Sequence, residues 1–385
     1  MTRFIHPCLS FGIILLMFLS CGGKHTPHSV SVDAVTEGDS LTDVPRYAKG
    51  FKLSTLSNGI RLLDISDPEK EEPRSYQYAL VPRGTSEVDV PDGYQAVMVP
   101  VDRVICMTTL QLSNFIALEA LEHVVGITST RHLFNKEMNQ RVKEGLTTKI
   151  GIEGNFDTEV ILAAHPDLIL ISPFKRGGYD ALKDTDIPLM PHLGYKELTP
   201  LGQAEWVKLV GVLIGEEEKA NALFDSISTR YNRLKTLTAQ ANVRPTVMSG
   251  EMRGGNWYAV GGQSFLAQLF RDAGADYFLK DDPNSGGINL DYETVYSQAA
   301  NVQYWRIMNS FDGTYSYDAL KATDSRYADF RAFKDKGVIY CNMKQKPYYE
   351  TMPMQPDLLL EDFVHVFHPD MLPSDYEPTY YDLLK

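Results

Sequence analysis

The pattern of apolar and polar residues changes along the chain. Between Tyr47 and Val101, short alternating runs are separated by the turn signals Asn58-Gly59, Asp67-Pro68 and Pro91-Asp92-Gly93. Period-two alternation interrupted by such residues is typical of short strands joined by turns. The pattern predicts a small antiparallel β segment, the β prelude, over residues 47–101.

From Arg103 onward, strand-like runs alternate with helical patterns. In the first half, strands are predicted at 104–107, 124–127, 168–172 and 188–192, with one helix over 113–122 and another that begins near Glu159. In the second half, strands are predicted near 245–249, 257–260, 302–308 and 338–341, with a helix over 263–273 that ends at Gly274. This alternation favours parallel sheets covered by helices.

The longest helical pattern lies between these halves. It begins at Thr199-Pro200, passes Gly215 and continues to about Gln240. Thr suits an N-cap, and Pro is favoured at the first helical position. We therefore predict an α/β protein with two Rossmann-like lobes, each with a central parallel sheet, joined by one long helix and preceded by the β prelude. The cleft between the lobes is the expected ligand site.

The first twenty residues have the features of an export signal. Arg3 supplies a positive charge, and residues 11–19 (FGIILLMFL) form an apolar core too short to span a bilayer. Ser20-Cys21-Gly22 follows directly and resembles the lipobox of bacterial lipoproteins, whose Cys is acylated, although Phe18 stands where Leu is more usual. An ordinary secretory signal with an incidental Cys is the alternative.

The residues that follow, 24–43, are polar and predict a disordered tether. The predicted segments are the signal peptide (1–20), the tether (21–46), the β prelude (47–101), the N-terminal lobe (102–198), the linking helix (199–241) and the C-terminal lobe (242–385).

One short pattern occurs twice. Asn155-Phe156-Asp157-Thr158-Glu159 recurs as Asn289-Leu290-Asp291-Tyr292-Glu293, displaced by 134 positions (293 − 159), and each copy precedes a segment that ends in a strand-like run. Asp suits an N-cap, and Glu in the first turn meets the positive end of the helix dipole. Singly, these are ordinary helix stabilisers. Two copies in matching contexts indicate two related halves with an equivalent acidic point in each.

The composition of the chain excludes some classes of binding partner and reaction. The 37 basic and 50 acidic residues give a net charge of −13, which argues against nucleic acid as a partner. Cys106 and Cys341 each lie in an apolar strand-like run, which predicts buried thiols rather than a disulfide. Phosphate-binding Gly-rich motifs and the G-x-S-x-G motif are absent from the sequence, so nucleotide hydrolysis would belong to a separate subunit.

Several segments resemble one family. They are DRVICMTTLQLSNFIALEALEHVVGIT, NFDTEVILAAHPDLILIS, INLDYETVYSQAANVQYWRI and QPDLLLEDFVHVFHPDMLP. Together they resemble the substrate-binding proteins of ABC importers for ferric siderophores, cobalamin and haem, over about residues 100–385. The pattern Ala163-x-x-Pro166-Asp167-Leu168 and the repeated Glu are the most specific signs. The β prelude lies outside the resemblance and has no assigned role.

The resemblance implies a binding protein and not an enzyme. Such a protein would capture an iron complex, a ferric siderophore, in the cleft and deliver it to the permease and ATPase subunit of an ABC importer; a corrinoid or haem is the alternative cargo. Glu159 and Glu293 match the acidic residues that dock on the permease in this family, and the linking helix would keep the lobes nearly rigid. The resemblance also implies a periplasmic, lipid-anchored protein of Bacteroides-type Gram-negative bacteria, which we expect to be monomeric.

Family ligands are held by the loops that follow the strands. The residues expected at the ligand are Thr108, Thr109, Phe174, Lys175, Tyr195, Arg253, Trp257, Tyr258 and Asn309. Aromatic rings would pack on a catecholate, corrin or porphyrin, and basic groups would meet anionic oxygens. For each residue, packing or a solvated surface is the alternative. No His occurs between Ala241 and Pro353, so we expect neither a free metal ion as ligand nor a cofactor.

Two other classes stay open. A chelatase on a similar scaffold would need a His and a carboxylate in the cleft, and His192 with Glu197 is the only local candidate. A surface lipoprotein that captures glycans or proteins without a permease is the other alternative.

Overall fold

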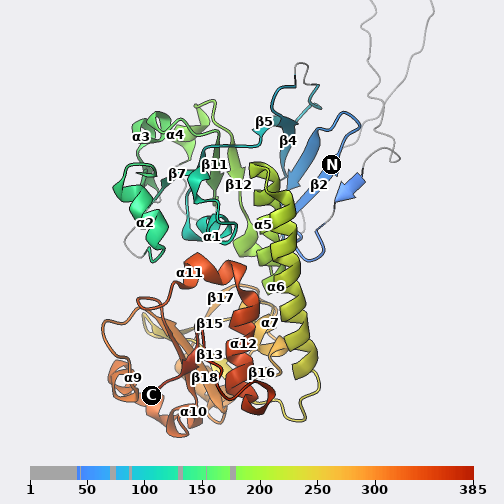
Figure 1. Ribbon diagram of the computed structural model, residues 1–385. Helices are drawn as coiled ribbons and strands as arrows, with labels where there is room; N and C mark the ends of the chain where they lie inside the picture. Colours follow the sequence, from blue (N-terminus) through green and yellow to red (C-terminus); the bar gives the residue numbers. More distant parts are fainter. Residues whose placement is uncertain are drawn as a thin grey trace, which may run out of the picture. The chain divides into compact units, whose positions relative to one another are not determined.

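The computed structural model describes residues 41–43, 45–69, 75–85, 89–128, 133–152, 154–173 and 179–385 (Figure 1). The predicted signal peptide and almost all of the tether, with Cys21, lie outside these ranges, as do Phe174 and Lys175. No helix in the described ranges is both long and apolar enough to cross a membrane.

The β prelude belongs to a five-stranded sheet whose strands follow chain order. The first strand, Leu41–Asp43, precedes residue 47 and pairs with the second, so these three residues of the predicted tether are part of the sheet instead. The first four strands are antiparallel neighbours, as predicted, but the last pair is parallel, with Tyr78 opposite Gln95 and Pro82 opposite Val99. The prediction of an entirely antiparallel segment was therefore wrong, because the chain between the last two strands crosses over instead of turning back. The strands are β1 (Leu41–Asp43), β2 (Phe51–Thr55), β3 (Arg61–Ile65), β4 (Tyr76–Pro82) and β5 (Gln95–Val99).

Two buried carboxylates attach the segment between β1 and β2 to the rest of the protein, Glu205 from the predicted linking helix and Glu197 from the N-terminal lobe. Glu205 accepts hydrogen bonds from the backbone N–H groups of Arg46 (3.0 Å), Tyr47 (2.7 Å) and Ala48 (3.0 Å). Glu197 accepts from the N–H groups of the next two residues and from the indole of Trp206 (3.0 Å). Burial raises the pKa of Glu197, and these donors oppose that shift. The prelude is therefore joined to the lobe by buried, charge-assisted hydrogen bonds.

The N-terminal lobe has a five-stranded parallel sheet in the order β12-β11-β6-β7-β8. Its four long strands match the prediction, but α1 starts at Thr109 rather than Ser113, because Thr108 and Gln111 form a capping box. The elements are β6 (Val104–Cys106), α1 (Thr109–Ala117), β7 (Val124–Ile127), α2 (Lys136–Lys143), β8 (Thr148–Lys149), β9 (Gly151–Ile152), β10 (Asn155–Phe156), α3 (Thr158–Ala163), β11 (Leu168–Ile171), α4 (Asp180–Lys183) and β12 (Leu189–Pro191).

The predicted linking helix consists of two helices, α5 (Pro200–Ile214) and α6 (Glu217–Thr238). Gly215 ends α5 in a left-handed conformation (φ 80°), which favours glycine. The helices then pack closely, since a Cβ built on Gly211 would lie 2.4 Å from the Ala220 methyl. Only α6, about 33 Å long at 1.5 Å per residue, extends from one lobe to the other (Figure 1). The prediction of one continuous link was wrong at this glycine.

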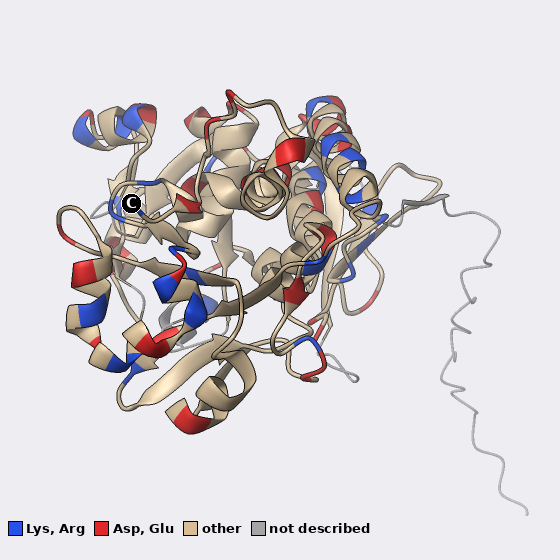
Figure 2. Cartoon of the chain, turned by 90° about the horizontal axis from the view of Figure 1, so that it is seen from below, with Lys and Arg blue, Asp and Glu red and all other residues tan. Residues whose placement is uncertain are grey.

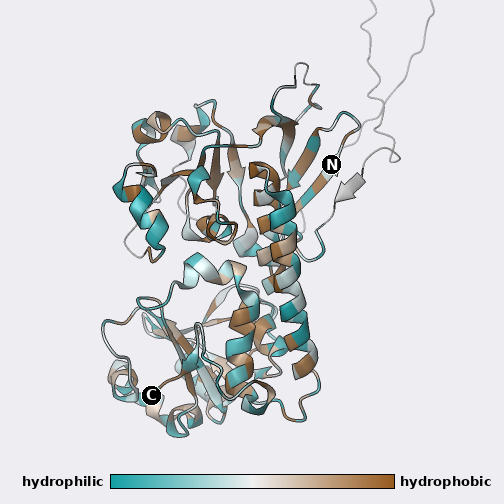
Figure 3. Ribbon diagram, in the orientation of Figure 1, coloured by the Kyte–Doolittle hydropathy of each residue, from teal (hydrophilic) through white to brown (hydrophobic). Residues whose placement is uncertain are grey.

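The face of α6 that packs on the protein is apolar, and its other side is polar (Figure 3). Phe224, Ile227, Tyr231 and Leu234 are buried along it, at the spacing expected of an amphipathic helix. In the view of Figure 2, acidic and basic residues are interspersed along the helices and do not gather into one basic patch.

The C-terminal lobe has a sheet in the order β16-β13-β18-β19-β20, parallel except for the last pair. The strand predicted near 257–260 belongs to a separate antiparallel sheet, β14-β15-β17. Cys106 and Cys341 are buried free thiols, as predicted. The elements are β13 (Thr246–Ser249), β14 (Glu251–Arg253), β15 (Asn256–Val260), α7 (Phe265–Asp272), β16 (Asp276–Tyr277), β17 (Gly287–Leu290), α8 (Tyr292–Ala299), β18 (Tyr304–Asn309), α9 (Tyr317–Thr323), α10 (Arg331–Lys334), β19 (Val338–Asn342), α11 (Tyr348–Thr351), α12 (Pro356–Phe367) and β20 (Asp382–Leu383).

Candidate ligand-binding cleft

Two adjoining cavities occupy the region where the lobes meet. The interlobe cavity, of about 430 Å³, is lined by both lobes, with Thr108 and Thr109 on one side and Glu350 on the other. The arginine cavity, of about 410 Å³, lies in the C-terminal lobe. Both are lined by Met343, Tyr348 and Tyr349, so they are neighbours separated by these side chains.

The interlobe cavity lies at the carboxyl ends of parallel strands from both sheets. Met107 and Thr128 follow β6 and β7, while Ser310 and Met343 follow β18 and β19, and all four line it. Ligands of open α/β sheets bind at this edge, because the loops there vary without disturbing the sheet. The N-terminus of α1 borders the same space through its cap, Thr108.

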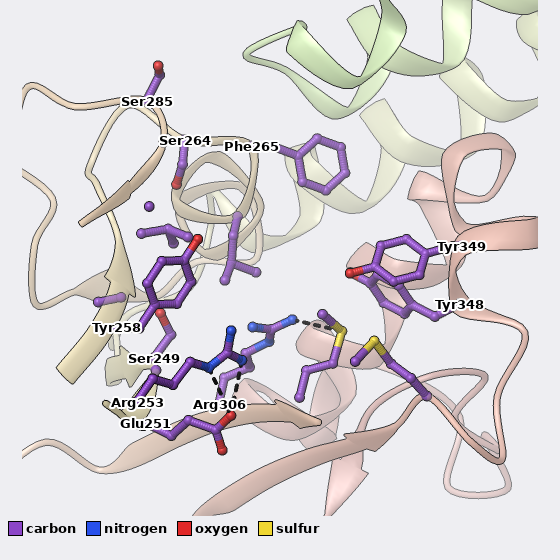
Figure 4. Close-up of a pocket in the computed structure, with 18 residues that line it drawn as sticks. Ser249, Glu251, Arg253, Tyr258, Ser264, Phe265, Ser285, Arg306, Tyr348 and Tyr349 are labelled. Carbon is purple, nitrogen blue, oxygen red and sulfur yellow. Dashed lines mark hydrogen bonds and ion pairs between the residues drawn. The ribbon is translucent and has the colours of Figure 1, made fainter. Parts of the chain in front are cut away.

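The arginine cavity carries basic and aromatic side chains (Figure 4). Arg253 ends β14, and its Nη2 donates to Glu251 Oε1 at 3.0 Å. The Arg253 guanidinium also lies 4.9 Å from the centre of the Tyr258 ring, a cation–π distance. Gly254 and Gly255, with φ of 58° and 89°, form the turn that brings Arg253 and Tyr258 to neighbouring strands.

Arg306 projects from β18 into the arginine cavity (Figure 4). Its Nε donates to the hydroxyl of Tyr381 at 2.8 Å, and its Nη2 contacts that hydroxyl and the Met308 sulfur (3.3 Å). Burial opposes its charge, but contact with Tyr381 and Tyr348 raises the pKa, so the guanidinium stays charged.

Carboxylates neutralise several cations near the cleft but not Arg306. Arg253 pairs with Glu251, Lys196 with Asp67 and Glu69, and Lys344 with Asp312. Within the described part of the chain, Arg306 and the cavity-lining Lys346 have no carboxylate within 4.0 Å. Both side chains are half-buried, where water screens a charge less than at the open surface, so this site favours an anion.

The loop after β3 reaches the rim of the arginine cavity. Ser285, which lines the cavity, donates through its hydroxyl to Glu69 Oε1 at 2.9 Å. Glu69 and Asp67 also form ion pairs with Lys196 of the N-terminal lobe. The β prelude therefore contacts both lobes beside the cleft.

The structure brings together four of the residues expected at the ligand. Thr108 and Thr109 line the interlobe cavity, and Arg253 and Tyr258 line the arginine cavity. Tyr195 lines a separate pocket of only about 10 Å³.

Two residues expected at the ligand, Trp257 and Asn309, line neither cavity. Trp257 is fully buried, donates its indole N–H to the Ser249 carbonyl (3.0 Å) and packs on Trp305 with ring centroids 5.4 Å apart. Strand alternation explains this placement, because neighbouring residues of β15 face opposite sides and Tyr258 takes the cavity side. Asn309 accepts a hydrogen bond from the Tyr340 hydroxyl (2.8 Å) and does not line either cavity.

Sequence reasoning missed Arg306, Tyr348 and Tyr349. The one available signal was Arg306 itself, a lone charge inside the strand-like run Tyr304-Trp305-Arg306-Ile307-Met308. Charged residues are rare at buried positions unless they have a partner or a role.

His192 and Glu197 lie in the core beside Trp206. Burial lowers the pKa of His192 to about 4, and its ring packs on Trp206 with centroids 4.8 Å apart. Glu197 is occupied by the indole and by backbone N–H groups. Neither residue lines the interlobe cavity or the arginine cavity, and the described residues contain no group of three or more His, Cys, Asp and Glu that could hold a metal ion.

The repeated motif forms matching helix starts in the two lobes. Asp157 caps α3 by accepting from the Val160 N–H (3.1 Å), and Asp291 caps α8 by accepting from the Thr294 N–H (2.7 Å). In each helix the Glu of the motif, Glu159 or Glu293, is exposed in the first turn. The predicted N-caps are confirmed.

Comparison with known proteins gives one family match. A family model described as periplasmic binding protein matches residues 104–344. An uncharacterized lipoprotein of Methanocaldococcus jannaschii is 24% identical over 373 residues, which cover 94% of this chain and 92% of the relative. The matched family range includes Thr108 and Arg306 but ends before Tyr348 and the C-terminal segment.

Solved structures share the fold. A periplasmic heme-binding protein from Pseudomonas aeruginosa has a TM-score of 0.56 at 18% identity, covering 74% of this chain and 98% of that chain. A protein of an ABC-type Fe3+-hydroxamate transport system from Saccharomonospora viridis has a TM-score of 0.53 at 19% identity, covering 70% and 94%. At these identities the likeness concerns the fold alone.

Proposed function

This chain belongs to the periplasmic binding protein family, the solute-binding components of ABC transporters, and we propose that it captures an anionic iron complex, a ferric siderophore, in its cleft. The resemblance read from the sequence is thereby confirmed at the level of the family. We infer that this chain binds its substrate without transforming it, because the family model and a solved structure of the same fold are named as binding proteins. The complex would be handed to a membrane permease whose ATPase is a separate subunit.

The observation that carries the proposal is the charge of Arg306 inside an aromatic cavity. Its guanidinium has no carboxylate partner among the described residues, and Phe265, Tyr258 and Tyr349 line the same space. A catecholate or carboxylate of a ferric chelate would supply the missing negative charge, while its ring or apolar backbone would pack on the aromatics.

Haem is the second candidate, because its propionates are anionic and its porphyrin is flat and aromatic. The same arginine and tyrosines suit both ligands. An uncharged corrinoid gains nothing from Arg306, so the cavity favours it least.

A panel titration tests the ligand class. Purified protein without its first 21 residues would be titrated with a ferric catecholate, a ferric hydroxamate, haem and cobalamin, following tyrosine and tryptophan fluorescence. Binding of an anionic member that is weakened at least tenfold in Arg306→Gln is expected, since charged hydrogen bonds contribute about 1.5–3 kcal/mol. Failure of every ligand to bind would remove the transport proposal.

We assign permease docking to Glu159 and Glu293. Both carboxylates are exposed in the first turns of α3 and α8, one in each lobe. Exposed charges orient and accelerate association more than they add affinity. The double variant Glu159→Lys/Glu293→Lys should therefore keep ligand affinity and abolish import.

First-turn acidic residues outside the motif provide the control. Glu137 of α2 and Asp318 of α9 are also exposed in first turns, so Glu137→Lys/Asp318→Lys changes the same net charge at equivalent helical positions. Import should survive in this control. Equal import by both double variants would refute the docking assignment.

We also propose acylation of Cys21, which lies outside the described residues. Its support is the lipobox-like Ser20-Cys21-Gly22 and the lipoprotein name of the archaeal relative. Mass spectrometry of the mature N-terminus should find a lipidated cysteine, and Cys21→Ser should release the protein from membranes. An unmodified N-terminus at another residue would contradict it.

A further inference from the structure

A buried carboxylate in α12 fixes the C-terminal segment. Asp362 is fully buried and accepts four hydrogen bonds: from the Tyr376 hydroxyl (2.7 Å) and from the backbone N–H groups of Thr379 (2.8 Å), Tyr380 (2.7 Å) and Tyr381 (2.9 Å). Both carboxylate oxygens therefore have two donors each. Such a saturated carboxylate holds the backbone of residues 379–381 in one place.

The residue fixed in this way is the one that contacts Arg306. The ring of Tyr381 is fully buried and stacks on Phe363, with centroids 5.0 Å apart and planes inclined by 25°. Its hydroxyl accepts from Arg306 Nε at 2.8 Å, and the guanidinium carbon lies 5.0 Å from the ring centroid. Backbone and ring are thus both held, so the hydroxyl has little freedom to follow a moving arginine.

Only one nitrogen of the guanidinium is left for a ligand. Nε and Nη2 are taken up by Tyr381 and Met308, whereas Nη1 has no hydrogen-bond partner among the described residues. Because a guanidinium is planar, fixing Nε and Nη2 also fixes the direction of Nη1. The cavity receives an oriented donor and not a mobile point charge.

We propose that Tyr381 is a positioning residue for Arg306, and that the C-terminal segment thereby sets the preference of the cleft for anionic ligands. The inference rests on the proposed function, since Arg306 must meet the ligand. Asp362 holds Tyr381, Tyr381 orients Arg306, and Arg306 binds the anion. Asp362 and Tyr381 follow the last residue of the family match, residue 344, so this arrangement is carried by the part of the chain beyond that match.

The central variant is Tyr381→Phe, which removes the hydroxyl and keeps the ring. Tyr317→Phe is the matched control, because Tyr317 is also buried and its hydroxyl accepts from a backbone N–H, that of Val338 (3.2 Å), instead of from Arg306. Both variants lose one hydroxyl in the same lobe. A general loss of stability would therefore affect the two alike.

The assay compares an anionic ferric catecholate with an uncharged ferric hydroxamate on the same protein samples. Tyr381→Phe should weaken the catecholate about tenfold and leave the hydroxamate unchanged, whereas Tyr317→Phe should change neither. In Arg306→Lys, which lacks the planar fork, adding Tyr381→Phe should cause little further loss, and this non-additivity separates positioning from stability.

The outcomes are distinguishable. Wild-type protein that binds neither chelate overturns the ferric-siderophore proposal and the inference with it. Wild-type protein that binds the catecholate with an affinity unaffected by Tyr381→Phe overturns the inference alone. An equal loss for both chelates in Tyr381→Phe also overturns it, because that result reports a distorted cavity.

Discussion

Glu205→Gln tests how the β prelude is attached to the lobes. The Glu205 carboxylate is fully buried and accepts hydrogen bonds from the backbone N–H groups of Arg46, Tyr47 and Ala48. It also forms an ion pair with Lys208 at 3.0 Å. Glutamine keeps the shape but has a single oxygen acceptor. Its NH2 group must then face at least one of these three N–H groups, which loses its acceptor.

The magnitude follows from these contacts. Hydrogen bonds to a charged acceptor contribute about 1.5–3 kcal/mol each, and removing one member of a buried ionic arrangement costs about 3–5 kcal/mol. We therefore expect Glu205→Gln to lower the free energy of unfolding by about 3–5 kcal/mol. This is a large share of the roughly 5–15 kcal/mol that stabilises a typical domain.

Glu217→Gln provides the matched control. Glu217 also joins the prelude to the helices, through Arg61 at 2.7 Å, but both side chains are about one-third exposed. Solvent screens such a pair, so the expected loss is at most about 1 kcal/mol.

The assay is urea unfolding of both variants, with hydrogen exchange measured at residues 46–48. Glu205→Gln should shift the unfolding midpoint and expose these amides to exchange, and Glu217→Gln should do neither. A loss below about 1 kcal/mol in Glu205→Gln, with the amides still protected, would refute the view that this carboxylate holds the prelude.

Three further predictions concern other parts of the molecule. Glu350→Gln should speed hydrogen exchange at the Phe134 and Asn135 amides about tenfold. The reason is that the Glu350 carboxylate accepts hydrogen bonds from both amides (2.6 and 2.8 Å) across the interlobe cavity. Unchanged protection of these amides would count against this contact. Lowering the pH from 6.5 towards 4 should destabilise the protein by up to about 3 kcal/mol through His192. The fold keeps this ring neutral with a pKa of about 4, so the unfolded chain binds more protons in that window, and His192→Gln should flatten the pH dependence measured by urea unfolding. Gly211→Val should unfold at markedly lower temperature, because even its Cβ would lie 2.4 Å from a methyl group of α6; an unchanged melting temperature would show that the helices can separate.

Local signals were sufficient wherever neighbouring residues decide the structure. Asp157 and Asp291 cap their helices within three residues of themselves, and the apolar runs that end at Cys106 and Cys341 form buried strands. The alternation of these elements along the chain was enough to predict the two α/β lobes. Thr108 illustrates the limit, because its capping box with Gln111 starts α1 at Thr109, before the predicted start at residue 113.

Contacts between distant residues decided the rest. Gly215 is compatible with a continuous helical pattern, yet in the structure it adopts a left-handed conformation that ends α5, and Gly211 of α5 packs against Ala220 of α6. In the sequence, Glu205 looks like an ordinary polar residue of a helix. Its role depends on backbone N–H groups that lie 157 to 159 positions away along the chain, and no local pattern predicts them.

By itself, the sequence determined the fold class, the family and the acidic start of one helix in each lobe, since these depend on short-range pattern. The tertiary structure alone decided which side chains meet in the cleft. Trp257 turns inward and Tyr258 outward on one strand, and Arg306 meets the Tyr381 hydroxyl from 75 positions away. These side-chain orientations and contacts depend on which surfaces of the sheets are buried against each other. No short sequence pattern predicts that packing.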